Sequence, residues 1–197
     1  MIEIMILPAP FSKLNDRALT KQRLNTNELL FCQGDLTHAI FFILSGTVHL
    51  VRHTEEGHRV VLHKALAGTT FAEASLFSDV YHCDAVASEK TVVLRLSKTD
   101  ILSMLSNDTA FSLALLKQLS DDVQTHRKHL ELLAIRRAQD RVFAALLSFG
   151  QRGKVTAFAS FIGLTNEATL RALSELVTQG KVTRVTRGQY KVRSTGP

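Results

Sequence analysis

The sequence predicts an α+β chain in which short antiparallel strands come first, a long helix follows, and a helical pair with a hairpin comes last. Glycine turns punctuate strand-like segments over about 28–97. The apolar period changes to three and four residues near residue 108, and a glycine-centred turn separates two short helical segments near 163–165. These observations divide the chain into predicted units at 1–107, 108–134 and 135–197.

The first unit is predicted to be an antiparallel β-roll of the jelly-roll kind. Strand-like segments end in turns near Gly34, Gly46 and Gly68, and residues 55–57 form the expected hairpin between two of them. Short strands at regular spacing, separated by glycine turns, are typical of an antiparallel barrel or sandwich.

The second unit, 108–134, is predicted to be one helix of roughly 25 residues, about 37 Å long. Asp108 or Thr109 is the expected N-cap. A helix this long exceeds the face of a small domain, and its heptad-like spacing suits a coiled coil, so we expect a homodimer. The alternative is a helix packed on its own barrel. The residues expected on the dimer helix are Leu115, Leu116, Leu119, Val123, His126 and Leu130.

The third unit has the pattern of a winged helix-turn-helix. Residues 155–162 carry apolar side chains at helical spacing, and Gly163 marks a tight turn. Thr165 is a good N-cap for a second helix, and residues 182–192 alternate around a glycine turn, as a hairpin does. In this motif the second helix enters the DNA major groove. An ordinary helix pair with a hairpin is the alternative interpretation.

Charge favours DNA binding over that alternative. Residues 134–197 hold eleven Lys/Arg and three acidic residues, a net charge of +8, whereas 1–133 hold thirteen basic and fifteen acidic residues, a net charge of −2. The positive charge of the whole chain, +6, therefore lies in its last third. A basic domain attracts polyphosphate by releasing counterions. We expect double-stranded DNA to be the partner.

Candidate DNA contacts fall into two groups. Side chains at the start of the second helix are expected to read bases, and basic or polar side chains around it are expected to bind phosphates, which positions a protein without specifying sequence. The base-reading candidates are Asn166, Glu167, Thr169, Leu170 and Arg171. The phosphate candidates are Gln151, Arg152, Lys154, Thr156, Thr165, Arg184 and Arg187.

Composition bounds the remaining possibilities. The chain is 45% apolar and 21% charged, and no apolar run reaches the roughly 18 residues that span a bilayer. The first residues lack the basic start of a secretory signal. Two cysteines, Cys32 and Cys83, make no disulfide framework. We therefore expect a cytoplasmic protein without a membrane partner.

The order of barrel, long helix and winged helix resembles the CRP/FNR family of bacterial transcription regulators. The resemblance covers about 28–192, and its motifs are Gln33–Asp35, Ile43–Gly46, Glu56–Gly57 and Phe71–Glu73. It implies that an effector held by the β-roll repositions the dimer helix, and that paired DNA domains match successive half-sites. RNA polymerase is a further partner that it implies. The family often reads DNA with Arg-Glu and a second Arg four residues on; here Asn166 takes the first place, so the preferred half-site should differ.

The family's ligand cassette is altered in this chain. Cyclic-nucleotide-binding members carry Phe-Gly-Glu and then, after about eight residues, an Arg that holds the cyclic phosphate. Here Ala72 replaces the Gly, His82 or Cys83 falls at the Arg, and Asp84 follows. A carboxylate beside a phosphate site is repulsive, so the effector is unknown and is not expected to be cyclic AMP. A cyclic-nucleotide-responsive regulator is the alternative. The candidate effector pocket comprises Phe71, Ala72, Glu73, Ala74, Ser75, His82 and Cys83.

Histidines suggest metal or haem only weakly. His82 and Cys83 are adjacent on extended chain, so their side chains point to opposite faces. His126 and His129 share a helix face and could hold zinc across a dimer, but a polar stripe beside the seam is the simpler interpretation. No metal or cofactor is expected.

Two other classes of protein are alternatives to a DNA-binding regulator. The sequence contains no Gly-rich phosphate loop, nucleophile elbow or paired-carboxylate motif, so we do not expect an enzyme. A ligand-binding regulatory module that acts through protein partners is the second alternative, and the basic last third argues against it.

Overall fold

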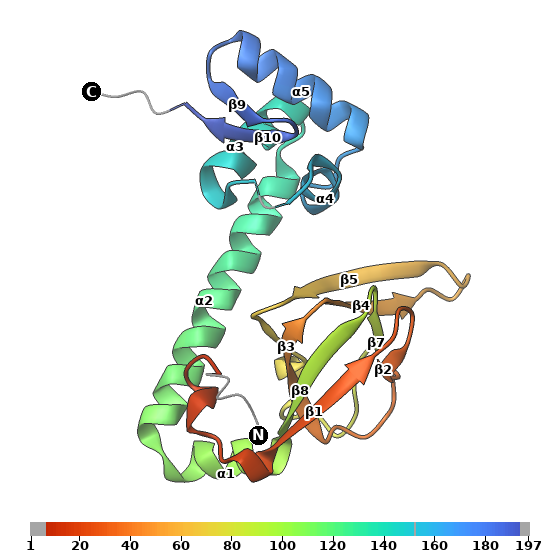
Figure 1. Cartoon of the computed structure of the whole chain (residues 1–197), viewed down its shortest axis with the longest axis vertical. Helices are drawn as coiled ribbons and strands as arrows, with labels where there is room; N and C mark the ends of the chain where they lie inside the picture. The colour runs from red at the N-terminus through yellow and green to blue at the C-terminus, as the bar shows by residue number, and fades with distance from the viewer. Residues whose placement is uncertain (1–6, 152, 194–197) are drawn as a thin grey trace. The chain divides into compact units, whose positions relative to one another are not determined.

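The computed structural model describes residues 7–151 and 153–193, and the chain divides into two compact units after Leu116. The predicted β-roll, long helix and helix-turn-helix with its hairpin are all present (Figure 1), so the predicted fold class is confirmed. The boundary between the units falls inside the long helix, so each unit holds part of it.

Two four-stranded antiparallel sheets form the β-roll of the first unit. One has the order β1-β8-β3-β6 and the other β2-β7-β4-β5. Alternation along β7, with every second residue buried, shows how each strand turns one face toward the opposite sheet. The strands are β1 (Leu19–Leu24), β2 (Leu29–Phe31), β3 (Ala39–Ser45), β4 (Thr47–His53), β5 (Arg59–Leu66), β6 (Thr70–Phe71), β7 (Asp84–Ala87) and β8 (Thr91–Ser97).

Gly46, between β3 and β4, has no substitute among the other amino acids. Its φ is +86°, and a Cβ added there would lie 2.6 Å from the Lys90 carbonyl oxygen and 2.8 Å from Thr91 Cα. A side chain would therefore clash with the backbone before β8 and would also strain its own backbone. This turn closes the β-roll because it sends the chain from one sheet to the other.

A row of aromatic rings fills the interior of the β-roll. Phe71 stacks on Phe41 with ring centroids 5.3 Å apart, Phe41 on Phe31 at 5.5 Å, and Phe31 on Tyr81 at 3.7 Å. All four side chains are buried. Large stacked rings contribute both buried apolar area and a fixed mutual geometry, so this row sets the spacing of the two sheets.

The first unit contains a strand and a helix that the sequence analysis did not predict. They are β1, which pairs with β8 along its whole length, and α1 (Lys98–Asn107), whose N-cap Ser97 accepts a hydrogen bond from the Asp100 amide at 3.3 Å. Two single-turn 3₁₀ helices, η1 (Phe11–Lys13) and η2 (Asp16–Ala18), precede β1.

The long helix α2 (Thr109–Ala134) begins after a charged cap. Asp108 Oδ1 accepts from the Phe111 amide at 2.9 Å, and Asp108 Oδ2 accepts from Lys13 Nζ at 2.7 Å. The Lys13 hydrogen bond, with that of the Phe111 amide, holds the pKa of Asp108 below its usual value. The expected choice of Asp108 or Thr109 as cap is thereby resolved in favour of Asp108.

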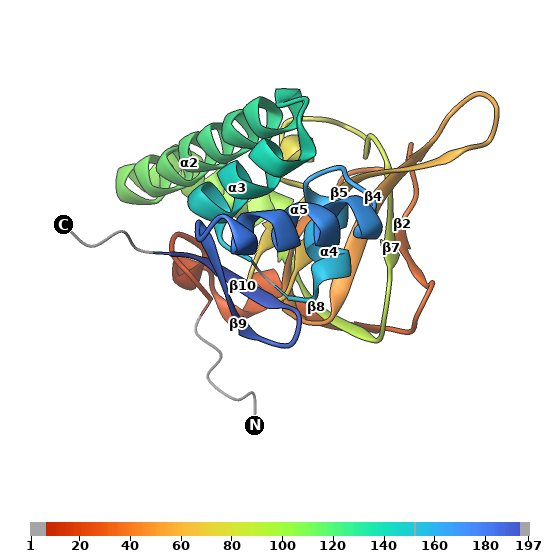
Figure 2. The same ribbon diagram turned by 90° about the horizontal axis from the view of Figure 1, so that it is seen from above.

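The second unit packs three helices and a hairpin around one core. α5 (Asn166–Thr178) lies against α3 (Ala138–Phe149) and α4 (Val155–Phe161), and the hairpin of β9 (Val182–Thr186) and β10 (Gln189–Val192) lies beside α3 and α5 (Figure 2). The fully buried side chains include Val142, Ile162 and Leu173. No helix within the described residues has the length and apolar character needed to cross a bilayer.

Candidate nucleic-acid interface and effector cassette

The turn between α4 and α5 is fixed by backbone hydrogen bonds and by one glycine. Gly163 has φ +64°, and the Leu164 amide donates to the Ala159 carbonyl oxygen at 3.0 Å. Thr165 Oγ1 then accepts from the Ala168 amide at 3.1 Å, as predicted for an N-cap. These contacts determine where α5 begins, and so they position its first exposed side chains.

The exposed face at the start of α5 carries most of the predicted base-reading residues. Asn166, Glu167, Leu170 and Arg171 are all exposed. Thr169 is different: its side chain is 0% exposed, and its Oγ1 donates to the Thr165 carbonyl oxygen at 2.9 Å. The prediction that Thr169 reads bases is therefore wrong.

Helical spacing explains the burial of Thr169. It lies three and four residues before Ala172 and Leu173, which are buried, so it belongs to the core-facing stripe. Its hydroxyl is compatible with that place because the carbonyl one turn earlier accepts its proton. Ala168, one position before Thr169, is only half-buried.

Glu167 and Arg171 pair with each other in the free chain. Arg171 Nη2 lies 3.0 Å from Glu167 Oε1, one helical turn apart, and both side chains are largely exposed. Exposed pairs at this spacing contribute only about 0.3–0.5 kcal/mol. Exchanging this pair for contacts to base edges would therefore cost little.

Of the predicted phosphate-binding side chains, Lys154, Thr156, Thr165, Arg184 and Arg187 are exposed. Arg152 lies outside the described residues. Across 7–151 and 153–193, the three cations among the exposed five have no carboxylate within 4 Å. Their charge is thus available to an external anion.

The side-chain amide of Gln151 is hydrogen-bonded within the protein and is therefore not free to bind a phosphate. Its Nε2 donates to the carbonyl oxygens of Gly188 at 2.7 Å and Gly153 at 3.2 Å, and its Oε1 accepts from the Tyr190 amide at 2.9 Å. Both ends of the amide thus hold the hairpin against the loop before α4. We correct its predicted role from phosphate ligand to support of the wing.

The last turns of α2 contact the helix-turn-helix within the second unit. His129 Nε2 lies 2.7 Å from the Phe161 carbonyl oxygen, and the two rings stack with centroids 4.4 Å apart. Arg141 of α3 donates through Nη1 to the carbonyl oxygens of Ile162 and Gly163, both at 3.3 Å. His129 is thus occupied with α4, and among the described residues no three His, Cys, Asp or Glu side chains group as a metal would need.

Side chains that are mostly apolar form an exposed stripe along α2. Its members follow alternating steps of three and four residues: Leu116, Leu119, Val123, His126, Leu130 and Leu133. Four of the five apolar members are exposed, Leu130 by 66%, and Leu119 is half-buried. Leu115 is 3% exposed and lies one turn after buried Phe111, outside this stripe, so its predicted place on a dimer face is wrong.

The cassette has a left-handed backbone at Ala72, the position where the resemblance places a glycine. Ala72 adopts φ +69°, a left-handed conformation that costs a residue with a Cβ about 1–2 kcal/mol. The one-turn helix η3 (Glu73–Ser75) follows it. Phe71 and Ser75 are buried, and Phe71 belongs to the aromatic row.

The second half of the cassette is held by contacts with β4 and with the loop after β2. Asp84 Oδ1 accepts from the Gln33 amide at 2.7 Å, and Arg52 Nη2 donates to the His82 carbonyl oxygen at 2.8 Å. Burial raises the pKa of the Cys83 thiol, which disfavours the reactive thiolate. Sequence analysis missed Arg52, because no spacing within the cassette points to β4.

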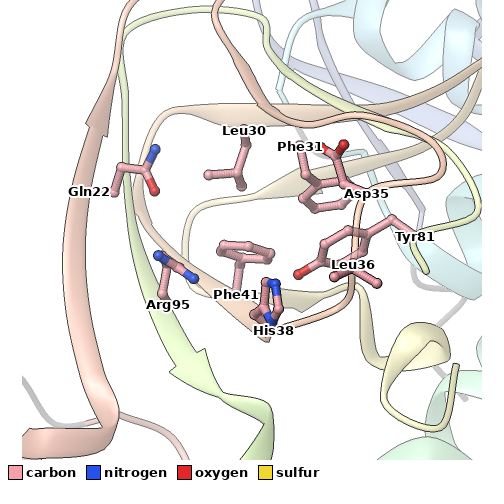
Figure 3. Close-up of a pocket in the computed structure, with 9 residues that line it drawn as sticks. All are labelled: Gln22, Leu30, Phe31, Asp35, Leu36, His38, Phe41, Tyr81 and Arg95. Atoms are coloured by element: carbon pink, nitrogen blue, oxygen red, sulfur yellow. The ribbon is translucent and has the colours of Figure 1, made fainter. Parts of the chain in front are cut away.

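A cleft lies inside the β-roll (Figure 3). Its volume is about 480 Å³, within the range of small-molecule sites. Burial raises the pKa of the Tyr81 phenol, which borders it. The lining residues are Gln22, Leu30, Phe31, Asp35, Leu36, His38, Phe41, Tyr81 and Arg95, and none of them belongs to the predicted effector pocket.

Comparison with known proteins agrees with this architecture. The family model of the cyclic nucleotide-binding domain matches residues 21–108. The cyclic AMP receptor protein of Thermus thermophilus is 30% identical over 172 residues, which cover 83% of this chain and 79% of that protein. The nitrogen fixation regulation protein FixK of Azorhizobium caulinodans is 24% identical, with 79% and 68% covered. The structure of FixK2 from Bradyrhizobium japonicum superposes with a TM-score of 0.66 at 21% identity, covering 89% of this chain and 93% of that one.

A β-roll followed by a long helix and a winged helix-turn-helix defines a class of protein: transcription regulators that join a sensor-type domain to a DNA-reading domain. The chain belongs to the CRP/FNR family of transcription regulators. The resemblance stated from the sequence is thereby confirmed.

Proposed function

We propose that this chain regulates transcription by binding a two-fold-symmetric DNA site as a homodimer. One observation carries the proposal: Asn166, Glu167, Leu170 and Arg171 stand exposed at the start of a capped recognition helix. The same unit exposes the cations Lys154 before α4 and Arg184 and Arg187 in the hairpin, and among the described residues no carboxylate lies within 4 Å of them. The relatives are transcription regulators, which is a non-enzyme family.

Each exposed side chain suits a different feature of a base pair. The Arg171 guanidinium can donate to guanine O6 and N7, and the Glu167 carboxylate can accept from cytosine N4. The amide of Asn166 suits adenine, and Leu170 can contact a thymine methyl. For these contacts to form, the Glu167–Arg171 pair opens, which the exposure of both groups makes inexpensive.

The stripe on α2 supports the dimer. Leu116, Val123 and Leu130 follow one another at seven-residue steps, and all are exposed in the single chain. Such spacing is that of a left-handed coiled coil, in which these side chains pack between those of a partner helix. A two-fold axis along this seam would present two recognition helices to successive half-sites.

We further propose that the β-roll does not respond to cyclic AMP. Arg52 of β4 donates to the His82 carbonyl oxygen, and Asp84 places a carboxylate beside the position at which the family carries its phosphate-binding Arg. Repulsion by that carboxylate opposes a cyclic phosphate. A cytoplasmic location and contact with RNA polymerase complete the proposal by analogy with the family.

Substitution of Arg171 tests DNA reading. Arg171→Ala should weaken binding to DNA selected by the wild-type protein by about 10- to 100-fold, as expected for about 1–3 kcal/mol of base discrimination, with little change on random DNA. Lys154→Ala is the matched control, because it should weaken both DNAs alike and reduce the salt slope by about one. Equal losses on selected and random DNA for Arg171→Ala would contradict base reading by α5.

A further inference from the structure

The cleft in the β-roll lies between the two sheets, where segments far apart in the sequence meet. Gln22 comes from β1, Phe31 from β2, Phe41 from β3 and Arg95 from β8, and Asp35 comes from the loop after β2. Figure 3 shows Gln22 and Arg95 on one side of the hollow and Asp35 on the other, with rings between them.

The floor of the cleft is aromatic and rigid. Phe31, Phe41 and Tyr81 are buried in the stacked row, and the Tyr81 hydroxyl donates to the Ala39 carbonyl oxygen at 2.7 Å. The Tyr81 amide donates to the Asp35 carbonyl oxygen at 2.9 Å, which ties the loop after β2 to the same residue. A surface held in this way needs little ordering when a flat apolar group stacks on it.

Arg95 is an unusual residue for its position. It pairs in register with Thr20 of β1 and Phe41 of β3, so its side chain stands on the inner face of the sheet, beside the aromatic floor. Throughout the described residues, no carboxylate lies within 4 Å of its guanidinium. The Gln22 amide lies on the same side of the hollow, as a further donor.

Asp35 supplies the opposite character across the cleft. Its Oδ2 accepts from the Cys32 amide at 2.8 Å, and within the described part of the chain its Oδ1 receives no hydrogen bond. One guanidinium balances one negative charge, and a carboxylate on the far wall disfavours a ligand that carries several. The cleft therefore suits a monoanion whose far end is a hydrogen-bond donor.

We propose that this cleft binds a small aromatic carboxylic acid. Its carboxylate lies on Arg95 and Gln22, its ring packs against the edges of Phe31 and Phe41 that border the cleft, and a hydroxyl at its far end donates to Asp35. The geometry of an Arg fork suits a carboxylate, which can accept two of its N–H groups at once. Binding itself is independent of DNA reading. Only its consequence for transcription rests on the proposed function, through Tyr81, which directly precedes His82–Asp84 of the cassette.

Calorimetric titration of the purified full chain tests the proposal, with 4-hydroxyphenylacetate as the probe. Saturable binding is expected, with at least tenfold weaker binding of 4-hydroxyphenylacetamide, which lacks the charge, and weaker binding of phenylacetate, which lacks the donor. Arg95→Gln should weaken binding of 4-hydroxyphenylacetate about 10- to 100-fold, the range expected for a lost charge-assisted hydrogen bond. Arg95→Lys, which keeps the charge without the fork, should retain part of the affinity.

Arg23→Gln is the matched control, because Arg23 lies on the same strand as Gln22 and its side chain points to the opposite face of the sheet. It should leave binding unchanged, and thermal unfolding should show that each variant is folded. Failure of all three compounds to saturate at millimolar concentration would overturn the proposal. So would equal affinities of acid and amide, or an Arg95→Gln variant that binds like wild type. None of these results bears on DNA binding, so the two proposals can fail separately.

Discussion

Substitution of Gln151 by Ala distinguishes a support of the wing from a phosphate ligand. The change removes two hydrogen bonds, of 2.7 and 2.9 Å, that join the loop before α4 to the hairpin, and a third, of 3.2 Å, within that loop. Each contributes about 0.5–1.5 kcal/mol net. The two carbonyl oxygens can turn to water, so the main loss is the acceptor of the Tyr190 amide. We expect the second unit to lose about 1–2 kcal/mol.

Two assays on the full chain report this loss. Calorimetry should show the transition of the second unit lowered by about 4–8 °C for each kcal/mol. Amide hydrogen exchange of 182–192 should become faster, with Tyr190 affected most. Lys154→Ala, a nearby exposed cation, should change neither measurement. An unchanged hairpin in Gln151→Ala, together with weaker DNA binding and a smaller salt slope, would refute the support role and restore the phosphate role.

Three further predictions follow from the geometry. Ala72→Gly should raise the free energy of unfolding by up to about 1 kcal/mol, because it relieves the left-handed backbone at φ +69° and part of that gain is offset by unfolded-state entropy. Ala74→Gly, at a position without a positive φ, should lower the free energy of unfolding. A lower free energy of unfolding in both variants on chemical denaturation would contradict the strain at Ala72. The pKa of Asp108 is lowered on folding, so its stabilisation is present above the unfolded value of about 4 and disappears as pH falls through the folded one. The gap in melting temperature between wild type and Asp108→Asn should therefore be present at pH 7 and should close as pH falls through the lowered pKa of Asp108, and a gap that stays constant into acid would count against the cap. Val123→Lys should raise the dimer dissociation constant at least about tenfold in analytical ultracentrifugation, whereas Gln124→Lys, off the stripe, should not, and similar effects of both would argue against this seam.

The sequence predicted the parts of the fold that local rules determine. A glycine turn and a Thr N-cap marked the start of the recognition helix, and the change in apolar period marked α2. β1 was not predicted because it contains few apolar residues, and Lys21, Gln22 and Arg23 interrupt any apolar alternation. Its pairing with β8, whose residues lie 67 to 77 positions later in the chain, is what makes it a strand.

The errors at the candidate site have separate physical causes. Thr169 was placed on the exposed face because it is polar, although its spacing belongs to the buried stripe. Leu115 shares the apolar character of Leu116 but lies one position, about 100° of helix, away from the seam. Gln151 acts on a hairpin 37 to 39 residues later, a distance over which no sequence motif extends.

The cleft could not have been found from local pattern at all. It assembles side chains from four strands and two loops, and the face of the sheet on which an Arg lies is unknown until the register of its strand is known. The sequence showed that the cassette departs from the family pattern. It could not show that Arg52 and Gln33, from a distant strand and loop, contact the cassette.

Selection of DNA fragments by the purified full chain, followed by sequencing, tests the central claim most directly. The account predicts an enriched inverted repeat whose half-sites lie one helical turn, about 10–10.5 base pairs, or a multiple of it apart. It also predicts that Arg171→Ala relaxes the preference at one position in each half-site. Recovery of random fragments, or of a single unrepeated motif, would contradict a two-fold-symmetric DNA-binding dimer.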